Sequence, residues 1–197
     1  MLVTAAQVLR ERGPAGVTID EVLARSGAPR GSVYYHFPHG RNQILTEALN
    51  QAGDAITAII DAGVDEGGVS MVRRFVEYWE HELTGSDFGA GCPVMAAAVS
   101  SSDDSPELAL VAGDIFRHWR AALTEAFRSD GLGRAEAVSL ARTCIAALEG
   151  AVVLARSTRA LGVLSDVAHE IEFLIRSRLF VHQNAPTNGG RASRQDA

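Results

Sequence analysis

Apolar residues recur along this chain at the spacing of an α-helix. In residues 69–84, for example, Val72, Phe75, Trp79 and Leu83 fall on one helical face. The sequence contains no run of alternating β-branched residues and no strand–helix–strand pattern. This periodicity predicts an all-α fold and leaves no candidate strand from which a sheet could form.

Glycine and proline interrupt the helical pattern and divide it into separate segments. Helices are predicted over residues 2–12, 18–26, 29–36, 41–62, 69–84, 94–101, 105–128, 134–160 and 164–182. The first three are short and predict a compact N-terminal head, which the fourth connects to a larger helical body. We therefore expect a head over residues 1–45, a body over 46–182 and a disordered polar tail over 183–197.

The stretch TIDEVLARSGAPRGSVYYHF, residues 18–37, predicts a helix-turn-helix. Thr18 and Glu21 have the spacing of a capping box, in which each side chain bonds a free backbone N–H group of the other residue. Pro29 is expected in the first turn of the second helix, a favoured place for proline. In a helix-turn-helix the N-terminal residues of the second helix face base edges in the DNA major groove.

The residue types of this second helix suit contact with DNA. Val33 and Phe37 are four residues apart and are assigned to the core of the head. Arginine can pair with guanine in the major groove, and hydroxyl or imidazole groups can donate to phosphates. The predicted DNA-binding residues are Thr18, Arg30, Gly31, Ser32, Tyr34, Tyr35, His36 and Arg41.

A structural explanation is available for several of these residues. Tyr34 and Tyr35 could be half-buried aromatic residues, and His36 could fill a gap in the packing. Arg41 could be a solvated residue at a helix start, and Thr18 could act only as a cap. Beside Arg30 the aromatic pair favours DNA contact over packing.

The net charge of −6 shows that the chain as a whole is not a binder of polyanions. Residues 1–49 carry five arginines against four acidic residues, whereas the remainder carries 13 arginines against 20 acidic residues. Only the head is therefore suited to meet an anionic partner, and the asymmetry is mild.

The segment GVTIDEVLARSGAPRGSVYYHFPHGRNQIL closely resembles the DNA-binding head of TetR-family transcriptional regulators. The features that carry the resemblance are Gly16, Thr18-Ile19, the turn Ser26-Gly27-Ala28, the run Ser32 to Phe37, and Arg41. The PHGRNQIL and GCPVMAAAVS stretches resemble the LmrA/YxaF-like branch of that family. Family members carry a basic arm ahead of the first helix, so here either the arm is absent or the true start lies upstream of Met1.

The resemblance implies an all-α homodimer whose two heads read a palindromic DNA operator and whose bodies bind a small-molecule effector. A repressor released by that effector is the function we expect. A transcriptional activator is the alternative within the family, and a helical ligand-binding or interaction protein with no role on DNA is the alternative outside it.

The body carries aromatic stripes that either complete the core or line an effector cavity. Tryptophan suits a mostly apolar pocket because its ring is large and it has one N–H donor. The candidate pocket residues are Phe75, Trp79, Met95, Phe116 and Trp119. Cys92 and the glycine-rich loop before Met95 are expected at the entrance.

The last two helices carry long apolar stripes with small residues that allow close helix approach. Two chains could bury these faces in a four-helix bundle, or the faces could complete the core of one chain. The candidate dimer residues are Cys144, Ala147, Leu148, Ala151, Ile171, Leu174 and Ile175.

Sites for other chemistry are not evident in the sequence. Cys92 and Cys144 lack CxxC spacing, and there is no HExxH motif, so we expect reduced thiols, no metal and no cofactor. Cys92 as a redox or electrophile sensor is the alternative. No nucleophile–base pair or phosphate-binding glycine loop indicates an enzyme, and no signal peptide or membrane span is expected, which predicts a cytoplasmic protein.

Overall fold

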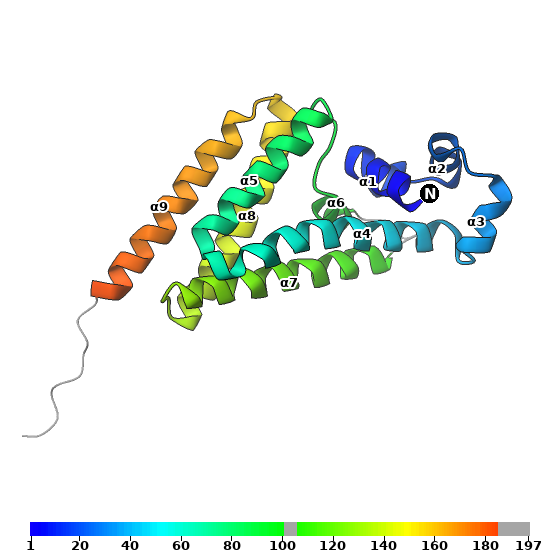
Figure 1. Cartoon of the computed structure of the whole chain (residues 1–197). Coiled ribbons are helices and arrows are strands. Elements are labelled where there is room, and N and C mark those ends of the chain that lie inside the picture. Colours follow the sequence, from blue (N-terminus) through cyan, green and yellow to red (C-terminus); the bar gives the residue numbers. More distant parts are fainter. Residues whose placement is uncertain (101–105, 185–197) are drawn as a thin grey trace, which may run out of the picture.

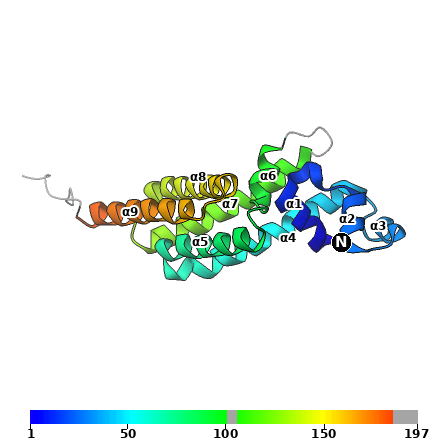
Figure 2. The same cartoon turned by 90° about the horizontal axis from the view of Figure 1, so that it is seen from above.

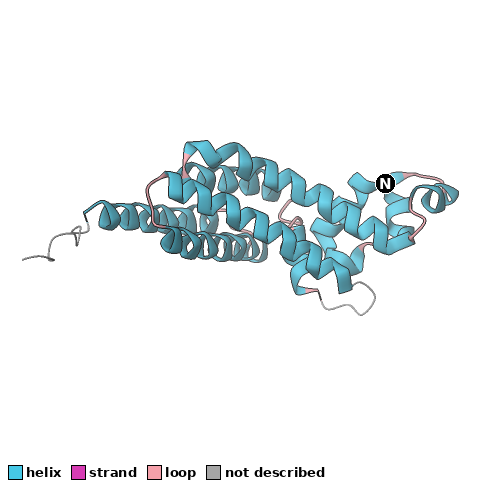
Figure 3. Ribbon diagram, turned by 90° about the horizontal axis from the view of Figure 1, so that it is seen from below, coloured by secondary structure: helices cyan, strands magenta, loops and turns pink. Residues whose placement is uncertain are grey.

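The computed structural model describes residues 1–100 and 106–184 of the chain. Its helices are α1 (Leu2–Gly16), α2 (Ile19–Ser26), α3 (Arg30–His36), α4 (Gly40–Gly63), the 3-10 helix η1 (Val64–Glu66), α5 (Gly68–Gly85), α6 (Pro93–Val99), α7 (Pro106–Ser129), α8 (Arg134–Thr158) and α9 (Gly162–Asn184). The described residues contain no strand, as the apolar spacing predicted (Figure 3).

The helices form a small head at one end of the molecule and a larger body at the other (Figure 1). α1, α2 and α3 make the head, and α4 runs from the head along α7 into the body (Figures 1 and 2). α8 packs against α7 and α9, while α5 packs against α4 and α9. The head is also supported from the body side, because α6 contacts α1 as well as α4 and α7.

The breaks at glycine and proline fall where predicted, with local differences. α1 extends to Gly16 rather than to residue 12, because the chain kinks at Gly13, with φ 68°, and then resumes a helical turn at Pro14. Pro29 precedes α3 as its N-cap rather than lying in its first turn. α9 continues to Asn184, so the predicted tail begins too early; its residues 185–197 lie outside the described part of the chain.

The head is held together by a small apolar core. Val33 and Phe37 are buried, which confirms their assignment to packing. They lie in one core with Val22 of α2, Leu9 of α1 and Leu45 of α4. The apolar spacing therefore fixes which face of α3 points inward and which residues remain on its surface.

The candidate dimer residues are mostly inside a single chain, which corrects their assignment to an interface. Cys144, Leu148, Ala151, Ile171 and Ile175 are all buried in the monomer core. Side chains enclosed by their own chain have no surface to offer a second copy. Ala147 and Leu174 remain partly buried and line a surface groove between α8 and α9.

α8 is long and apolar enough to cross a bilayer by length and composition. In this fold it is instead a central helix of the body, packed against α7 and α9. It also carries a buried glutamate, Glu149, near its middle. The apolar character of α8 is that of a core helix.

Candidate functional site

The outward face of α3 carries two large exposed aromatic side chains. Tyr34 is 61% exposed and Tyr35 is 83% exposed, so neither is half-buried packing. Tyr35 is in edge contact with His36, with 5.0 Å between the ring centroids, and His36 is itself exposed. Aromatic rings held at the surface beside polar groups are typical of a contact surface rather than of a core.

Arg30 lies at the first turn of α3, where it extends toward α2. Its Nη1 donates to Asp20 Oδ1 at 2.8 Å, and both side chains are largely exposed. Such a pair is weak because water screens it, so the guanidinium is available to another anionic partner. Asp20, which had not been predicted as part of this site, is the residue that pairs with Arg30.

Ser32 and Gly31 complete the exposed start of α3. The Ser32 hydroxyl donates to the Pro29 carbonyl at 2.6 Å, which stabilises the first turn of the helix. A Cβ built at Gly31 would meet no atom within 4 Å, so this position lies in open space. Another molecule can therefore approach the backbone of α3 closely at Gly31.

Thr18 caps α2 as predicted, but only half of the capping box forms. The Thr18 hydroxyl accepts a hydrogen bond from the Glu21 backbone N–H at 3.1 Å. The Thr18 N–H donates to the Gly16 carbonyl, and the Glu21 carboxylate instead accepts from Arg12 and Arg25. The reciprocal bond was wrong because these arginines compete for the carboxylate.

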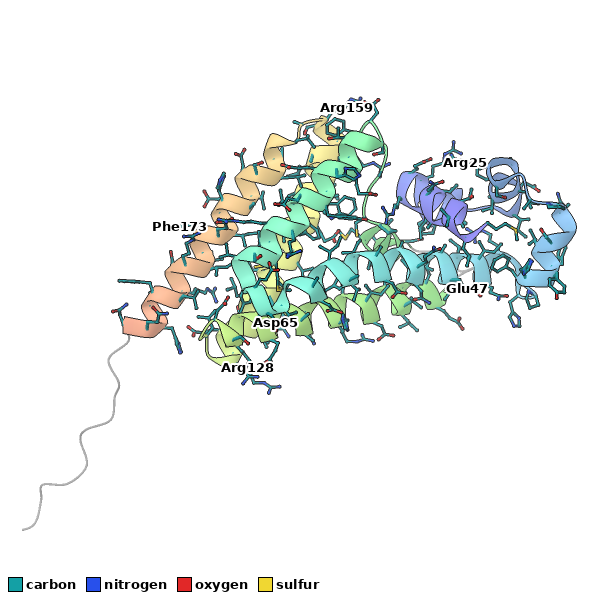
Figure 4. All side chains as sticks on the ribbon, viewed as in Figure 1. Arg25, Glu47, Asp65, Arg128, Arg159 and Phe173 are labelled. Carbon is teal, nitrogen blue, oxygen red and sulfur yellow. The ribbon has the colours of Figure 1, made fainter. Side chains whose placement is uncertain are left out.

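Arg25 ties the first two helices of the head together (Figure 4). Its guanidinium donates to Glu11 of α1 and to Glu21 of α2. Its pKa is raised, chiefly by the hydrogen bond to Glu11 and then by that to Glu21. Arg25 is therefore engaged within the head rather than free at its surface.

Arg41 is partly buried at the start of α4 and bonds the backbone of the head. Its Nε donates to the Val17 carbonyl and its Nη2 to the Pro14 carbonyl, each at 2.8 Å. These bonds hold the connection that leads into α2. They give Arg41 a structural role that the sequence analysis missed, and its contact with DNA stays a prediction.

The body contains a small cavity between α4, α5, α7 and α8. Its volume is about 20 Å³, and its lining consists of Ile60, Met71, Val72, Phe75, Trp119, Leu123, Ile145, Leu148 and Glu149. Phe75 and Trp119, two of the candidate pocket residues, are therefore brought together. A drug-sized ligand occupies several hundred Å³, so the cavity would have to enlarge to admit one.

The other candidate pocket residues lie around this cavity rather than in its lining. Trp79 is buried next to Phe75, with 6.1 Å between the ring centroids. Phe116 is in edge contact with Trp119 but lines a surface groove between α7 and α8. Met95, on α6, is partly buried against the core.

Glu149 is the buried charge that the sequence analysis did not identify as functional. It is 3% exposed, and burial raises the pKa of its carboxyl from 4.5 to about 7. The neighbouring Cys92 thiol slightly opposes this effect as a weak donor. The signal in the sequence was a glutamate inside the most apolar window of the chain, AALEGAVVLARS.

Cys92 precedes α6 and is buried. Burial, followed by the nearby Glu149 carboxylate, raises the pKa of its thiol well above the usual value. Thiolate is the reactive form of cysteine, so this environment disfavours the redox-sensor alternative. Among the described residues, no group of three or more metal-ligating side chains occurs.

Two known protein-family profiles match this chain. The profile described as "Bacterial regulatory proteins, tetR family" matches residues 1–48. The profile described as "Transcriptional regulator LmrA/YxaF-like, C-terminal domain" matches residues 68–170, more than half of the chain. The chain belongs to the TetR family of transcriptional regulators, in its LmrA/YxaF-like branch.

Individual relatives agree with this assignment to TetR regulators. An uncharacterized HTH-type transcriptional regulator of Mycobacterium tuberculosis is 37% identical over 91% of this chain and 94% of its own. The HTH-type transcriptional regulator LmrA of Bacillus subtilis is 26% identical over 81% of this chain and 86% of its own.

A solved TetR transcriptional regulator from Legionella pneumophila shares the fold. Its TM-score is 0.75 at 19% identity, and the match covers 88% of this chain and 94% of that one. These findings identify a DNA-binding regulator with a helix-turn-helix head and a helical body, and the family consists of regulators rather than enzymes.

Proposed function

We propose that this TetR regulator is a repressor that binds a palindromic operator and leaves it when a small-molecule effector binds the body. The exposed surface of α3 carries the proposal. Tyr34 and Tyr35 are large aromatic residues left at the surface beside Arg30, although the opposite face of the same helix is buried. Large aromatic side chains exposed together in this way mark a surface that binds a partner.

Each residue of this surface has a proposed role on DNA. Arg30 leaves Asp20 and pairs with a guanine, since that exposed ion pair is weak. Tyr34, Tyr35, His36 and Ser32 contact phosphates or sugars and fix the register of the head. Gly31 admits the close approach of the DNA backbone.

The start of α2 supplies a further phosphate contact in this proposal. Thr18 is exposed there, at the positive end of the helix dipole. Arg41 fixes this position through its bonds to the Val17 and Pro14 carbonyls. We therefore expect Arg41 to act mainly by holding the head in shape and to meet phosphate only with its remaining N–H groups.

The working unit in this proposal is a homodimer formed through the outer faces of α8 and α9. Large apolar side chains are exposed on these two helices, namely Val153, Leu154, Phe173, Phe180 and Val181. The groove between the helices has a volume of about 780 Å³ and includes Ala147, Leu174 and Phe173 in its lining. Apolar surface of this extent on paired helices suits a four-helix bundle between two chains.

Contacts between head and body provide a route for the effector to act. The Gly91 N–H, in the loop after α5, donates to the Arg10 carbonyl of α1 at 2.9 Å. The Arg10 guanidinium pairs with Glu82 of α5, and Arg156 of α8 donates to the Glu11 carbonyl at 2.6 Å. Movement of α5 or α8 on effector binding would therefore shift α1, and α4 would carry the change to α3.

In this proposal, effector binding changes the distance between the two heads of the dimer, and this change releases DNA. Half-sites one turn apart require heads about 34–36 Å apart, so a modest shift spoils the fit to both major grooves. The coupling between effector and operator is commonly ~1–3 kcal/mol and acts in both directions. An effector that left operator affinity unchanged would contradict this mechanism.

The test is binding of the purified protein to the DNA that flanks its own gene, followed by fluorescence anisotropy at two salt concentrations. We expect saturable binding that survives unlabelled competitor DNA and weakens as salt rises. The double variant Arg30→Ala/Tyr34→Ala should lose specific binding and keep its helical content and oligomeric state. Normal operator binding by this variant would overturn the role assigned to α3.

A matched control uses exposed residues on body helices rather than on α3. Leu110 on α7 is exposed, and so is Glu77 on α5. The variant Leu110→Ala/Glu77→Ala should bind the same DNA as the parent protein does. Release of DNA on adding effector, combined with a reporter assay in cells, distinguishes a repressor from the activator alternative. We expect the protein to act in the cytoplasm.

A further inference from the structure

Three neighbouring side chains in the body hold buried polar atoms with no hydrogen-bond partner among the described residues. These atoms are the Tyr78 hydroxyl oxygen, Trp79 Nε1 and both carboxylate oxygens of Glu149. Buried polar groups in native proteins are nearly always paired. A cluster that combines a carboxylate with two unpaired donor groups therefore calls for a physical explanation.

These groups lie together at one side of the body cavity. Glu149 of α8 and Phe75 of α5 both contribute to its lining, and the Phe75 and Trp79 rings are 6.1 Å apart. Tyr78 is in edge contact with Trp79, with 5.3 Å between the ring centroids. The Cys92 thiol adjoins the Glu149 carboxyl and also affects the pKa of Tyr78.

Among these unpaired buried groups, Glu149 accounts for most of the unfavourable free energy. Burying a carboxylate without a counter-charge is unfavourable, because the protein interior replaces none of the water it loses. Among the described residues, no arginine or histidine bonds this carboxyl, and Cys92 offers only a weak donor. By contrast, Trp119 in the same cavity has its Nε1 satisfied by the Thr57 hydroxyl at 2.8 Å.

We infer that Glu149 is the anchor for a positively charged amine on the effector, whose apolar or aromatic skeleton occupies an enlarged form of this cavity. The inference rests on the proposed function, in which the body binds an effector, and it adds the chemical class of that effector. The ammonium group donates to the Glu149 carboxylate, while Trp79 and Tyr78 donate to an oxygen elsewhere on the molecule.

An organic cation fits these residues better than the other candidate classes. An anionic effector would be repelled by Glu149, and a metal ion would find only the Glu149 and Cys92 side chains as ligands among the described residues. Phe75 and Trp119 line the same cavity as the carboxyl. The negative faces of their rings attract a cation, which adds to its pairing with Glu149.

The proposed amine site lies beside contacts between the body and α1 of the head. The Tyr78 ring also faces the guanidinium of Arg10 on α1, with 6.0 Å between that group and the ring centroid. Cys92 follows directly on Gly91, which bonds the Arg10 carbonyl. Enlarging the cavity beside Tyr78 and Cys92 would therefore disturb two of the contacts that hold α1 against the body.

The test uses arylalkylamines of increasing size, from 2-phenylethylamine upward, each paired with the alcohol and the carboxylate of the same carbon skeleton. Thermal unfolding of the full chain is measured with each compound. The amines should raise Tm by about 3–5 °C at ten times their Kd, whereas the alcohols and carboxylates should not. Equal stabilisation by the neutral partners, or none by any amine, overturns the inference.

Two variants separate the role of Glu149 from general effects. Glu149→Gln keeps the shape of the side chain without its charge and should weaken amine binding about tenfold or more. Glu77→Gln removes an exposed charge on α5 and should leave it unchanged. Circular dichroism and the Tm without compound verify that both variants fold, and unchanged amine affinity in a folded Glu149→Gln variant overturns the inference.

Calorimetry gives a second readout that does not depend on Tm. At pH 7 the Glu149 carboxyl is partly protonated, because its pKa is about 7. Binding an ammonium ion should ionise it and release about half a proton, seen as a dependence of the binding heat on the buffer. The Glu149→Gln variant should release none, and equal release by both proteins counts against the inference.

Operator binding measured on the same samples separates the two proposals. If the parent protein binds its operator but no amine stabilises it selectively, only the assignment of the effector class fails. If amines bind through Glu149 but no operator is bound at any salt, the proposed function fails and the amine site stands.

Discussion

Individual residues acquire their properties here from where they are placed rather than from their type. Arginine at position 30 is exposed at the tip of the head, whereas arginine at position 41 is held by two backbone carbonyls. Glu149 is enclosed in the body, although most acidic side chains of the protein lie at its surface. Because Glu149 is buried, we expect the free energy of unfolding to depend on pH.

The free energy of unfolding should change with pH because Glu149 binds its proton more tightly in the folded protein. Its pKa is about 7 in the folded protein, against 4.5 as its ordinary value, so the folded state retains this proton to higher pH than the unfolded state does. This contribution to the free energy of unfolding is complete below pH 4.5 and is lost as pH rises through 7, by up to about 3 kcal/mol.

Urea unfolding between pH 5 and pH 8 measures this effect. Glu149→Gln should gain stability relative to the parent protein as pH rises, since the variant has no proton to lose. Cys92 is the titratable group beside the carboxyl, and its thiol stays protonated over this range because its pKa is raised. A constant difference between the two proteins at all pH values would show that the carboxyl is solvated.

At the scale of elements, the head depends on how α2 ends and α3 begins. α2 ends at Ser26 and is capped by Gly27, whose φ of 67° lies in the left-handed region and whose N–H donates to the Leu23 carbonyl. Only glycine adopts this conformation without strain from a Cβ. Gly31, four residues later, has no such constraint and lies on the exposed side of α3.

Alanine substitutions at these two glycines should therefore have opposite effects on stability. Gly27→Ala should destabilise the head by about 1–2 kcal/mol, although its Cβ would meet no atom within 4 Å. Gly31→Ala should be neutral or stabilising by up to about 1 kcal/mol, because alanine favours the helix. Urea unfolding at fixed protein concentration compares them, and equal losses would contradict the role of the left-handed turn.

At the scale of the whole molecule, large apolar side chains on α8 and α9 are exposed within the described part of the chain. Phe173 is 69% exposed on α9, and Figure 4 shows it on that helix at the far end of the molecule from the head. Leu110 is exposed to the same extent, 69%, but belongs to α7 rather than to α8 or α9. The two residues thus form a matched pair for testing where a second chain binds.

A charge placed on the α8–α9 surface should break the dimer. Phe173→Glu is expected to raise the dimer dissociation constant at least about tenfold, because two carboxylates would be buried near each other across a two-fold interface. Leu110→Glu should leave dimerisation unchanged. Sedimentation velocity over a range of concentrations distinguishes these outcomes, and a fully dimeric Phe173→Glu protein would place the interface elsewhere.

The sequence by itself determined the helices, the turn chemistry of the head and the family. Periodicity placed Val33 and Phe37 in the core, which is confirmed, and this left Tyr34 and Tyr35 outside. These features are local, since the spacing of apolar residues and the conformational limits of glycine and proline act over a few positions.

Only the tertiary structure decided which of several apolar faces each body helix turns inward. α8 is apolar on most sides, so its sequence could not show that Cys144 and Leu148 face the core while Val153 and Leu154 face outward. Likewise, Arg41 meets carbonyls 24 and 27 residues earlier in the chain. Glu149 joins Phe75 and Cys92 only because α5, α8 and the loop before α6 pack together, and long-range packing of this kind has no periodic signal in the sequence.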